Sequence, residues 1–102
     1  MDQELIEASR KYDFIVSSVN DFKKHQPDIS KLDEYQKTIR TIDELKSLQS
    51  NWNKVGVKFK RKKNRKNTEY FLKSFNDYAR EFIRLAGELE TAFEAFKNKI
   101  KG

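Results

Sequence analysis

Few side chains in this sequence are suited to acid–base or metal chemistry. His25 is the only His, and the chain contains no Cys, which excludes a thiol nucleophile, a Cys-containing zinc cluster and a disulfide framework. His25 comes shortly before Pro27, where a helix is expected to end. We therefore interpret His25 as an exposed residue at the end of a helix, where a positive charge is favourable.

The carboxylates do not form a catalytic arrangement either. They occur in short groups, namely Asp33–Glu34, Asp43–Glu44 and Glu88 with Glu90. Neighbouring residues of a helix point in different directions, and residues two apart do not face each other. The sequence also lacks a Glu-x-x-His motif, a Gly-rich phosphate loop and a Ser or Cys nucleophile motif. We predict a chain that is not an enzyme and that holds no cofactor and no metal.

The densest feature is a run of basic residues from Lys54 to Lys66. It holds eight Lys or Arg residues and no acid, whereas the net charge of the whole chain is only +6. The candidate contacts are Lys54, Lys58, Lys60, Arg61, Lys62, Lys63, Arg65 and Lys66. Charges this close repel one another, and they are favoured beside phosphates, acidic lipids or an acidic protein.

Several interpretations of the basic run stay open. Binding of nucleic acid would use its cations on phosphates and Phe59 as a stacking residue. Phe59 would equally suit insertion at a membrane interface. The run also resembles a basic nuclear-localisation signal, and it would serve simply as a solvated connection between helices. Trp52 is a second candidate stacking or turn residue, although its spacing favours a place in the core.

Three amphipathic helices must position these residues. The first apolar stripe is Leu5, Ala8, Tyr12, Ile15, Val19 and Phe22, widened by Ile6, Phe14 and Val16. The second is Leu32, Tyr35, Ile39, Ile42, Leu45, Leu48, Trp52 and Val55. The third is Phe71, Phe75, Tyr78, Phe82, Leu85, Leu89, Ala92 and Phe96, broadened by Ile83, Ala86, Phe93 and Ile100. Spacings of three and four predict helices over about 3–24, 30–58 and 68–100, with a basic connection over 56–67.

Local signals set the expected helix ends. Pro27 stops the first helix, and Ser30 is expected to cap the second. Asn67 or Thr68 is expected to cap the third. Val55-Gly56-Val57 forms helix poorly, so the second helix should end between Lys54 and Arg61.

These elements predict one all-α domain over residues 1–102. Its architecture is an antiparallel three-helix bundle, or a long helical hairpin with a third helix packed on it. The first helix is the shortest, so one end of the hairpin is expected to stay uncovered and to favour a homodimer or a partner chain. No apolar run is long enough to span a bilayer and no secretory signal is visible. We therefore expect a soluble cytoplasmic protein, with signal-less export left open.

The layout resembles the Trp-x-Gly helical-hairpin substrates of type VII secretion. Those are short, signal-less chains without Cys, in which two long helices flank a central Trp-x-Gly turn. Here Trp52 lies near the middle of the chain, and Gly56 and Phe59 follow it.

This chain also departs from that pattern. Its Gly comes two positions late in Trp52-Asn53-Lys54-Val55-Gly56, and Pro27 interrupts the first half. The export signal of the family, an aromatic followed four residues later by an acid, is missing after both Phe93 and Phe96. The resemblance therefore implies an accessory partner or chaperone of such a substrate.

The sequence as a whole predicts a non-enzymatic helical interaction protein, acting as a binding, adaptor or inhibitor module through protein–protein contacts or self-association. One alternative is a nucleic-acid-binding module that uses the run from Lys54 to Lys66. The other is the accessory role that the resemblance implies.

Overall fold

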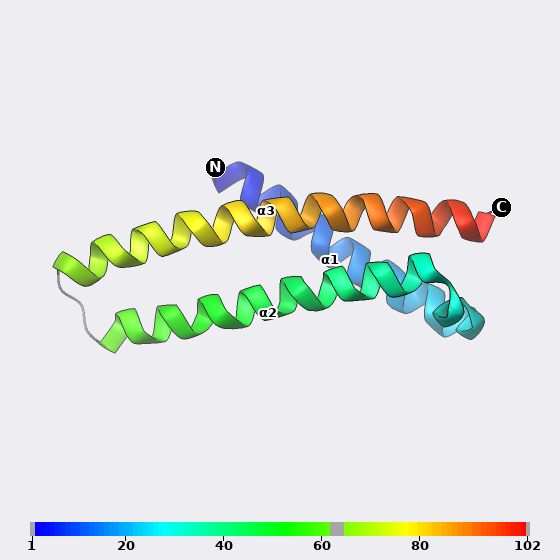
Figure 1. Ribbon diagram of the computed structural model, residues 1–102, viewed down its shortest axis with the longest axis horizontal. Helices are drawn as coiled ribbons and strands as arrows, with labels where there is room; N and C mark the ends of the chain where they lie inside the picture. The colour runs from blue at the N-terminus through cyan, green and yellow to red at the C-terminus, as the bar shows by residue number, and fades with distance from the viewer. Residues whose placement is uncertain (1, 62–64, 102) are drawn as a thin grey trace.

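A computed structural model describes residues 2–61 and 65–101, and every element in those ranges is helical (Figure 1). The elements are α1 (Asp2–His25), the 3-10 helix η1 (Pro27–Lys31), α2 (Asp33–Arg61) and α3 (Arg65–Lys101). Helices α2 and α3 form a long antiparallel hairpin, and α1 lies obliquely across one face of it. The predicted all-α fold is confirmed.

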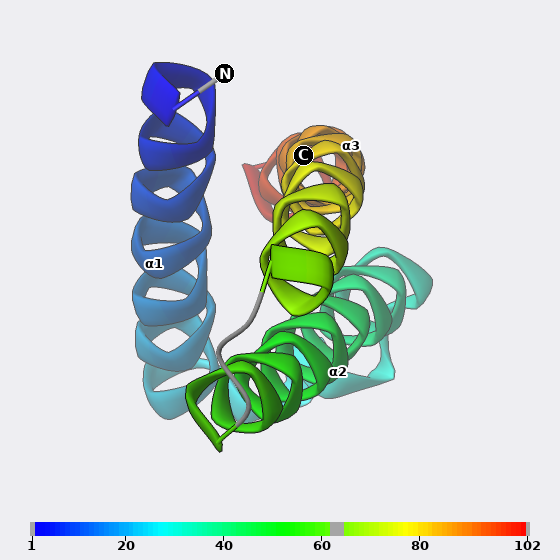
Figure 2. The ribbon, with the colours of Figure 1, turned by 90° about the vertical axis from the view of Figure 1, so that its left-hand side faces the viewer.

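The apolar stripes meet in one core. Buried residues come from all three α-helices and from η1, and they include Tyr12 of α1, Leu45 of α2 and Phe82 of α3. The widening predicted for the first stripe is wrong at two positions, because Ile6 and Phe14 are 51% and 66% exposed. Helix α1 packs against the hairpin on one side only, so its outer side remains in solvent (Figure 2).

The turn between α1 and α2 differs from the prediction. Pro27 begins η1, and its fixed φ suits the first residue of a helix. The Ser30 hydroxyl donates a hydrogen bond to the Pro27 carbonyl, with an O–O distance of 3.1 Å, so Ser30 stabilises η1 and does not cap α2. Helix α2 begins only at Asp33.

The predicted basic connection is mostly helix. Helix α2 continues through Val55-Gly56-Val57 to Arg61, and α3 already begins at Arg65, so Asn67 and Thr68 lie in its first turn and do not cap it. Within the connection predicted over 56–67, only residues 62–64 lie outside the described part of the chain. Val55 lies beside Ser74 and Tyr78 of α3, and tertiary contacts of this kind can override a low helix propensity.

The molecule is elongated. It measures 55 × 22 × 18 Å and its radius of gyration is 16.5 Å, against about 13 Å for a compact domain of this length. Among the described side chains, the buried positions of α2 end at Leu45 and those of α3 begin at Ala79. We call the part of the hairpin beyond these positions, residues 46–61 and 65–78, the open half; it projects past the N-terminal end of α1 (Figure 1).

Candidate functional site

Aromatic side chains hold the two helices of the open half together. The Trp52 ring of α2 lies 5.0 Å from the ring centroid of Phe71 and 5.5 Å from that of Phe75. It also stacks on Tyr78 at 5.1 Å with an interplanar angle of 13°. Burial raises the pKa of the Tyr78 phenol, which is already neutral at physiological pH without this shift. Trp52 thus forms part of the contact between α2 and α3.

These rings are only half-buried because no third helix covers them. Trp52, Phe71 and Phe75 all keep part of their surface in solvent. In the core, by contrast, Phe82 and Phe96 have no exposed surface. The open half is therefore a two-helix continuation of a three-helix core.

One apolar side of α3 continues past the end of α1. Ile83 and Ala86 line a shallow groove with Ala8 of α1, so they lie on the side of α3 that α1 covers. Ala79 and Leu72 follow them at intervals of four and seven residues, which places all four on one side of the helix. Ala79 is fully buried, whereas Leu72 is 56% exposed. Leu72 therefore marks where the cover from α1 has ended.

Basic residues of both helices meet at the tip of the open half. Lys54 and Lys58 are exposed near the end of α2, and Arg65 and Lys66 are exposed at the start of α3. The first turn of α3 contains no acid, so Arg65 and Lys66 stand at the positive end of the helix dipole without compensation. An anionic group at the tip would relieve this repulsion.

The remaining candidates of the basic run are only partly placed. Phe59, Lys60 and Arg61 belong to the last turn of α2. Lys62 and Lys63 lie outside the described residues. Trp52 and Gly56 both lie inside α2, so the chain turns after Arg61 and not at Gly56.

Two exposed carboxylates lie near the opposite end of the open half. Glu4 and Glu7 are exposed near the start of α1 and line the same groove as Ile83. In that region Lys11 forms an ion pair with Glu90 of α3, with an N–O distance of 2.9 Å. The hydrogen bond to Glu90 raises the pKa of Lys11. The N-terminal end of α1 lies near the start of the open half (Figure 1) and carries the exposed carboxylates of Glu4 and Glu7.

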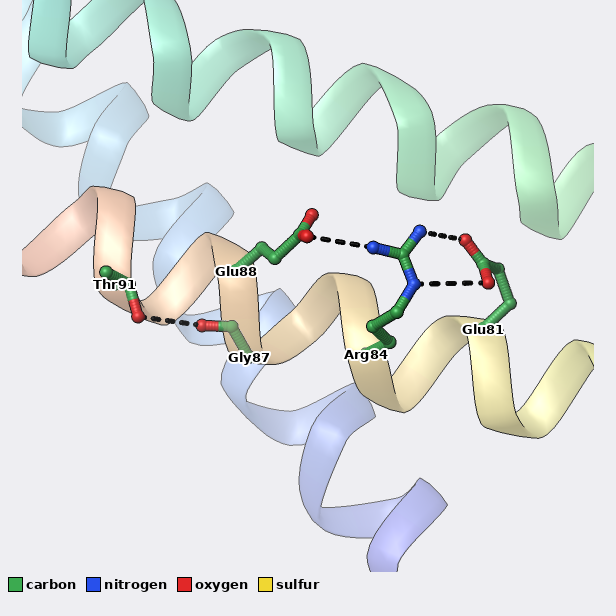
Figure 3. A network of polar contacts seen from close by, with 5 residues as sticks. All are labelled: Glu81, Arg84, Gly87, Glu88 and Thr91. Atoms are coloured by element: carbon green, nitrogen blue, oxygen red, sulfur yellow. Dashed lines mark hydrogen bonds and ion pairs between the residues drawn. The ribbon is translucent and has the colours of Figure 1, made fainter.

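A third charged region lies between α2 and α3. Figure 3 shows Arg84 of α3 pointing toward α2 between two carboxylates of its own helix. Its guanidinium group donates to both oxygens of Glu81 and to Glu88, the latter at 2.8 Å. Glu44 of α2 lines the adjoining groove. The hydrogen bond to Glu81 is the main cause of the raised pKa of Arg84, and Glu88 and Glu44 raise it further. Cations and anions are paired here, so this region presents no strong field of one sign.

The residues with acid–base chemistry remain separated. His25 is exposed in the last turn of α1, as its position in the sequence predicts. Within residues 2–61 and 65–101, no three His, Asp or Glu side chains are grouped so that they could hold a metal ion. No helix in the same ranges is long and apolar enough to cross a membrane.

Sequence reasoning missed the exposed apolar residues of the open half. Leu72 lies beside the predicted stripe and outside its heptad spacing, and Val57 is part of the segment expected to end α2. Both are more than half exposed. The signal that could have located Leu72 is its seven-residue spacing from Ala79.

In comparisons with protein-family models, with curated proteins and with solved structures, nothing matches this chain.

Proposed function

We propose that this chain is a non-enzymatic interaction protein that binds a helical partner through the open half of its hairpin. The observation that carries the proposal is the change along one side of α3, from the fully buried Ala79 to the largely exposed Leu72. Apolar residues on this side of α3 continue past the part that α1 covers, and they offer a surface on which another amphipathic helix can pack.

The shape and charge of the open half support this function. Its two helices present an aromatic contact that is only half-buried, and a third or fourth helix would remove the rest of it from water. The basic tip adds a preference for a partner with acidic residues at one end. The accessory role implied by the secretion resemblance would use this same surface.

Affinity capture from extracts of the source cells tests the proposal. The wild-type chain should retain a helical protein, and the variant Leu72→Asp should lose it because the substitution places a carboxylate in the apolar contact. Phe14→Asp is the matched control, since Phe14 is also more than half exposed but lies on α1. Loss of the partner in both variants, or in neither, would argue against the open half as the binding surface.

Binding of nucleic acid is a second candidate, favoured by the meeting of Lys58, Arg65 and Lys66 at one tip. These side chains come from two helices and are all exposed, which suits contact with consecutive phosphates. If all eight basic residues of the run met phosphates of duplex DNA, affinity would fall by roughly 10³-fold or more between about 50 and 200 mM salt.

Fluorescence anisotropy with labelled oligonucleotides separates the two candidates. If the basic tip contacts the phosphates of the oligonucleotide, replacing Lys58, Arg65 and Lys66 by Gln should weaken binding and reduce its salt dependence. Replacing Lys23, Lys24 and Lys31 by Gln removes the same charge from exposed positions at the other end of the molecule and is the control. Equal losses of oligonucleotide affinity in the two variants would indicate that the net positive charge of the protein alone attracts the oligonucleotide.

A further inference from the structure

The open half is long enough to receive another helical hairpin. From Arg65 to Tyr78 the helix α3 covers about 20 Å at 1.5 Å per residue. A second pair of helices of this length would complete a four-helix bundle, the arrangement that buries one stripe from each helix. The open half of a second copy of this chain has the required length and the required apolar residues.

The two ends of the open half carry opposite charges. The tip presents Lys58, Arg65 and Lys66, and the end next to the core presents Glu4 and Glu7 of α1. If two copies pack antiparallel, the basic tip of each lies beside the acidic start of α1 in the other. A parallel arrangement would bring two basic tips together, and like charges in contact are strongly unfavourable.

We infer that this chain forms a symmetric antiparallel homodimer in which the two open halves pack on each other. The inference rests on the proposed function and names its partner. In a two-fold symmetric interface the same surface serves on both copies, so Leu72, Trp52 and Phe75 of each copy contribute to one apolar centre. The two contacts between a basic tip and the start of α1 flank this centre.

Sedimentation velocity across a wide range of protein concentration measures the association. The wild-type chain should form a dimer, and Leu72→Asp should raise the dimer dissociation constant by roughly 10-fold or more, as expected for a central interface residue. Phe14→Asp should leave the dissociation constant unchanged. Circular dichroism of each variant should show unchanged helicity, which separates loss of the interface from loss of the fold.

Charge reversal tests the antiparallel arrangement. One variant carries Glu4→Lys and Glu7→Lys, and the other carries Lys58→Glu, Arg65→Glu and Lys66→Glu. Each alone should associate more weakly than wild type. The first places lysines beside the basic tip of the other copy, and the second places three carboxylates of each tip beside Glu4 and Glu7 of the other copy. Mixed together they should form a heterodimer, since both flanking contacts regain opposite charges.

The outcomes are distinct for the two proposals. A wild-type chain that stays monomeric at every concentration overturns the homodimer, and the proposed function survives if a different helical protein is captured and lost with Leu72→Asp. A dimer that tolerates Leu72→Asp, or charge-reversed variants that fail to recover when mixed, also overturns the antiparallel dimer. A monomer that captures no protein overturns both, and binding of oligonucleotides by that monomer would favour the second candidate function.

Discussion

At the scale of single residues, Arg84 shows how charge on the hairpin is neutralised locally. It bonds to Glu81 and Glu88 of its own helix, one turn before and one turn after it (Figure 3). All three side chains are about half exposed, so these ion pairs are screened by water and orient the side chains more than they stabilise the fold.

The hydrogen bond from Arg84 lowers the pKa of Glu81. A carboxyl with a lowered pKa in the folded state stabilises the fold above its unfolded pKa, and this contribution is lost as the pH falls through the folded value. We expect Arg84→Met to raise the titration midpoint of Glu81 toward its ordinary range, measured by NMR of the side-chain carboxyl. Lys97→Met removes a cation elsewhere on α3 and should leave that midpoint unchanged; an equal rise in both variants would contradict the local pairing.

Phe96 is the residue on which several elements of the core converge. It has no exposed surface, and its ring contacts Phe22 of α1 at 5.7 Å and Tyr35 of α2 at 5.8 Å. We expect Phe96→Ala to lower the free energy of unfolding by about 3–5 kcal/mol, because it removes a large buried ring and leaves a cavity. Urea denaturation followed by circular dichroism measures this change.

The comparison for Phe96 is Phe14, which lies on the outer side of α1. It is 66% exposed, so Phe14→Ala should change the free energy of unfolding by less than about 0.5 kcal/mol. Similar losses of unfolding free energy in Phe96→Ala and Phe14→Ala would show that the side of α1 that carries Phe14 is buried.

At the scale of elements, the heptad spacing predicted which residues meet but not where the helices end. Leu45, Phe82 and Leu89 were expected in the core, and each is buried. Burial follows from periodicity because one stripe of a long helix must leave water. The end of a helix depends on a few local bonds, and here Ser30 bonds to Pro27 rather than to the start of α2.

The candidate site was less predictable than the core. The run from Lys54 to Lys66 was visible in the sequence as a connection between two helices, but not that α2 would extend to Arg61 and α3 would begin at Arg65. The exposure of Leu72 depends on how far α1 extends along α3. The spacing of apolar residues within each helix does not predict how two helices are placed along each other.

Gly87 lies inside α3, where Gly has a low helix propensity. The close approach of another helix would explain a Gly at such a position. A Cβ added at Gly87 would meet nothing within 4 Å, and the position is exposed. We expect Gly87→Ala to raise the free energy of unfolding by about 0.5–1 kcal/mol through reduced backbone entropy of the unfolded chain. Thermal and urea denaturation would measure the increase in the free energy of unfolding. A decrease would instead indicate that another molecule packs closely against Gly87.

At the scale of the whole molecule, stability and charge are unequally distributed along the 55 Å axis. The three-helix half contains almost all of the buried apolar surface, and the open half ends in the basic tip. A single chain is therefore stable at one end and sparsely supported at the other. Binding at the open half would remove this imbalance.

Hydrogen exchange of the backbone amides tests this uneven stability directly. In a dilute, monomeric sample, amides over 33–45 and 79–96 should exchange slowly, because their opening disrupts the three-helix core. Amides over 46–61 and 65–78 should exchange faster, since the rings that join these segments, such as Trp52 and Tyr78, are only partly buried. Uniform protection in the monomer would contradict the view that α1 is what stabilises the hairpin.

The same measurement at high protein concentration connects stability to association. If two open halves pack on each other, exchange over 46–61 and 65–78 should slow as the dimer forms, because binding of the native state stabilises the region that it covers. Exchange on the outer side of α1, around Phe14, should not change. In Leu72→Asp the difference between the two halves should persist at every concentration, since the interface is lost while the three-helix core remains. Slowing of the open half in Leu72→Asp as well would place the contact on another surface.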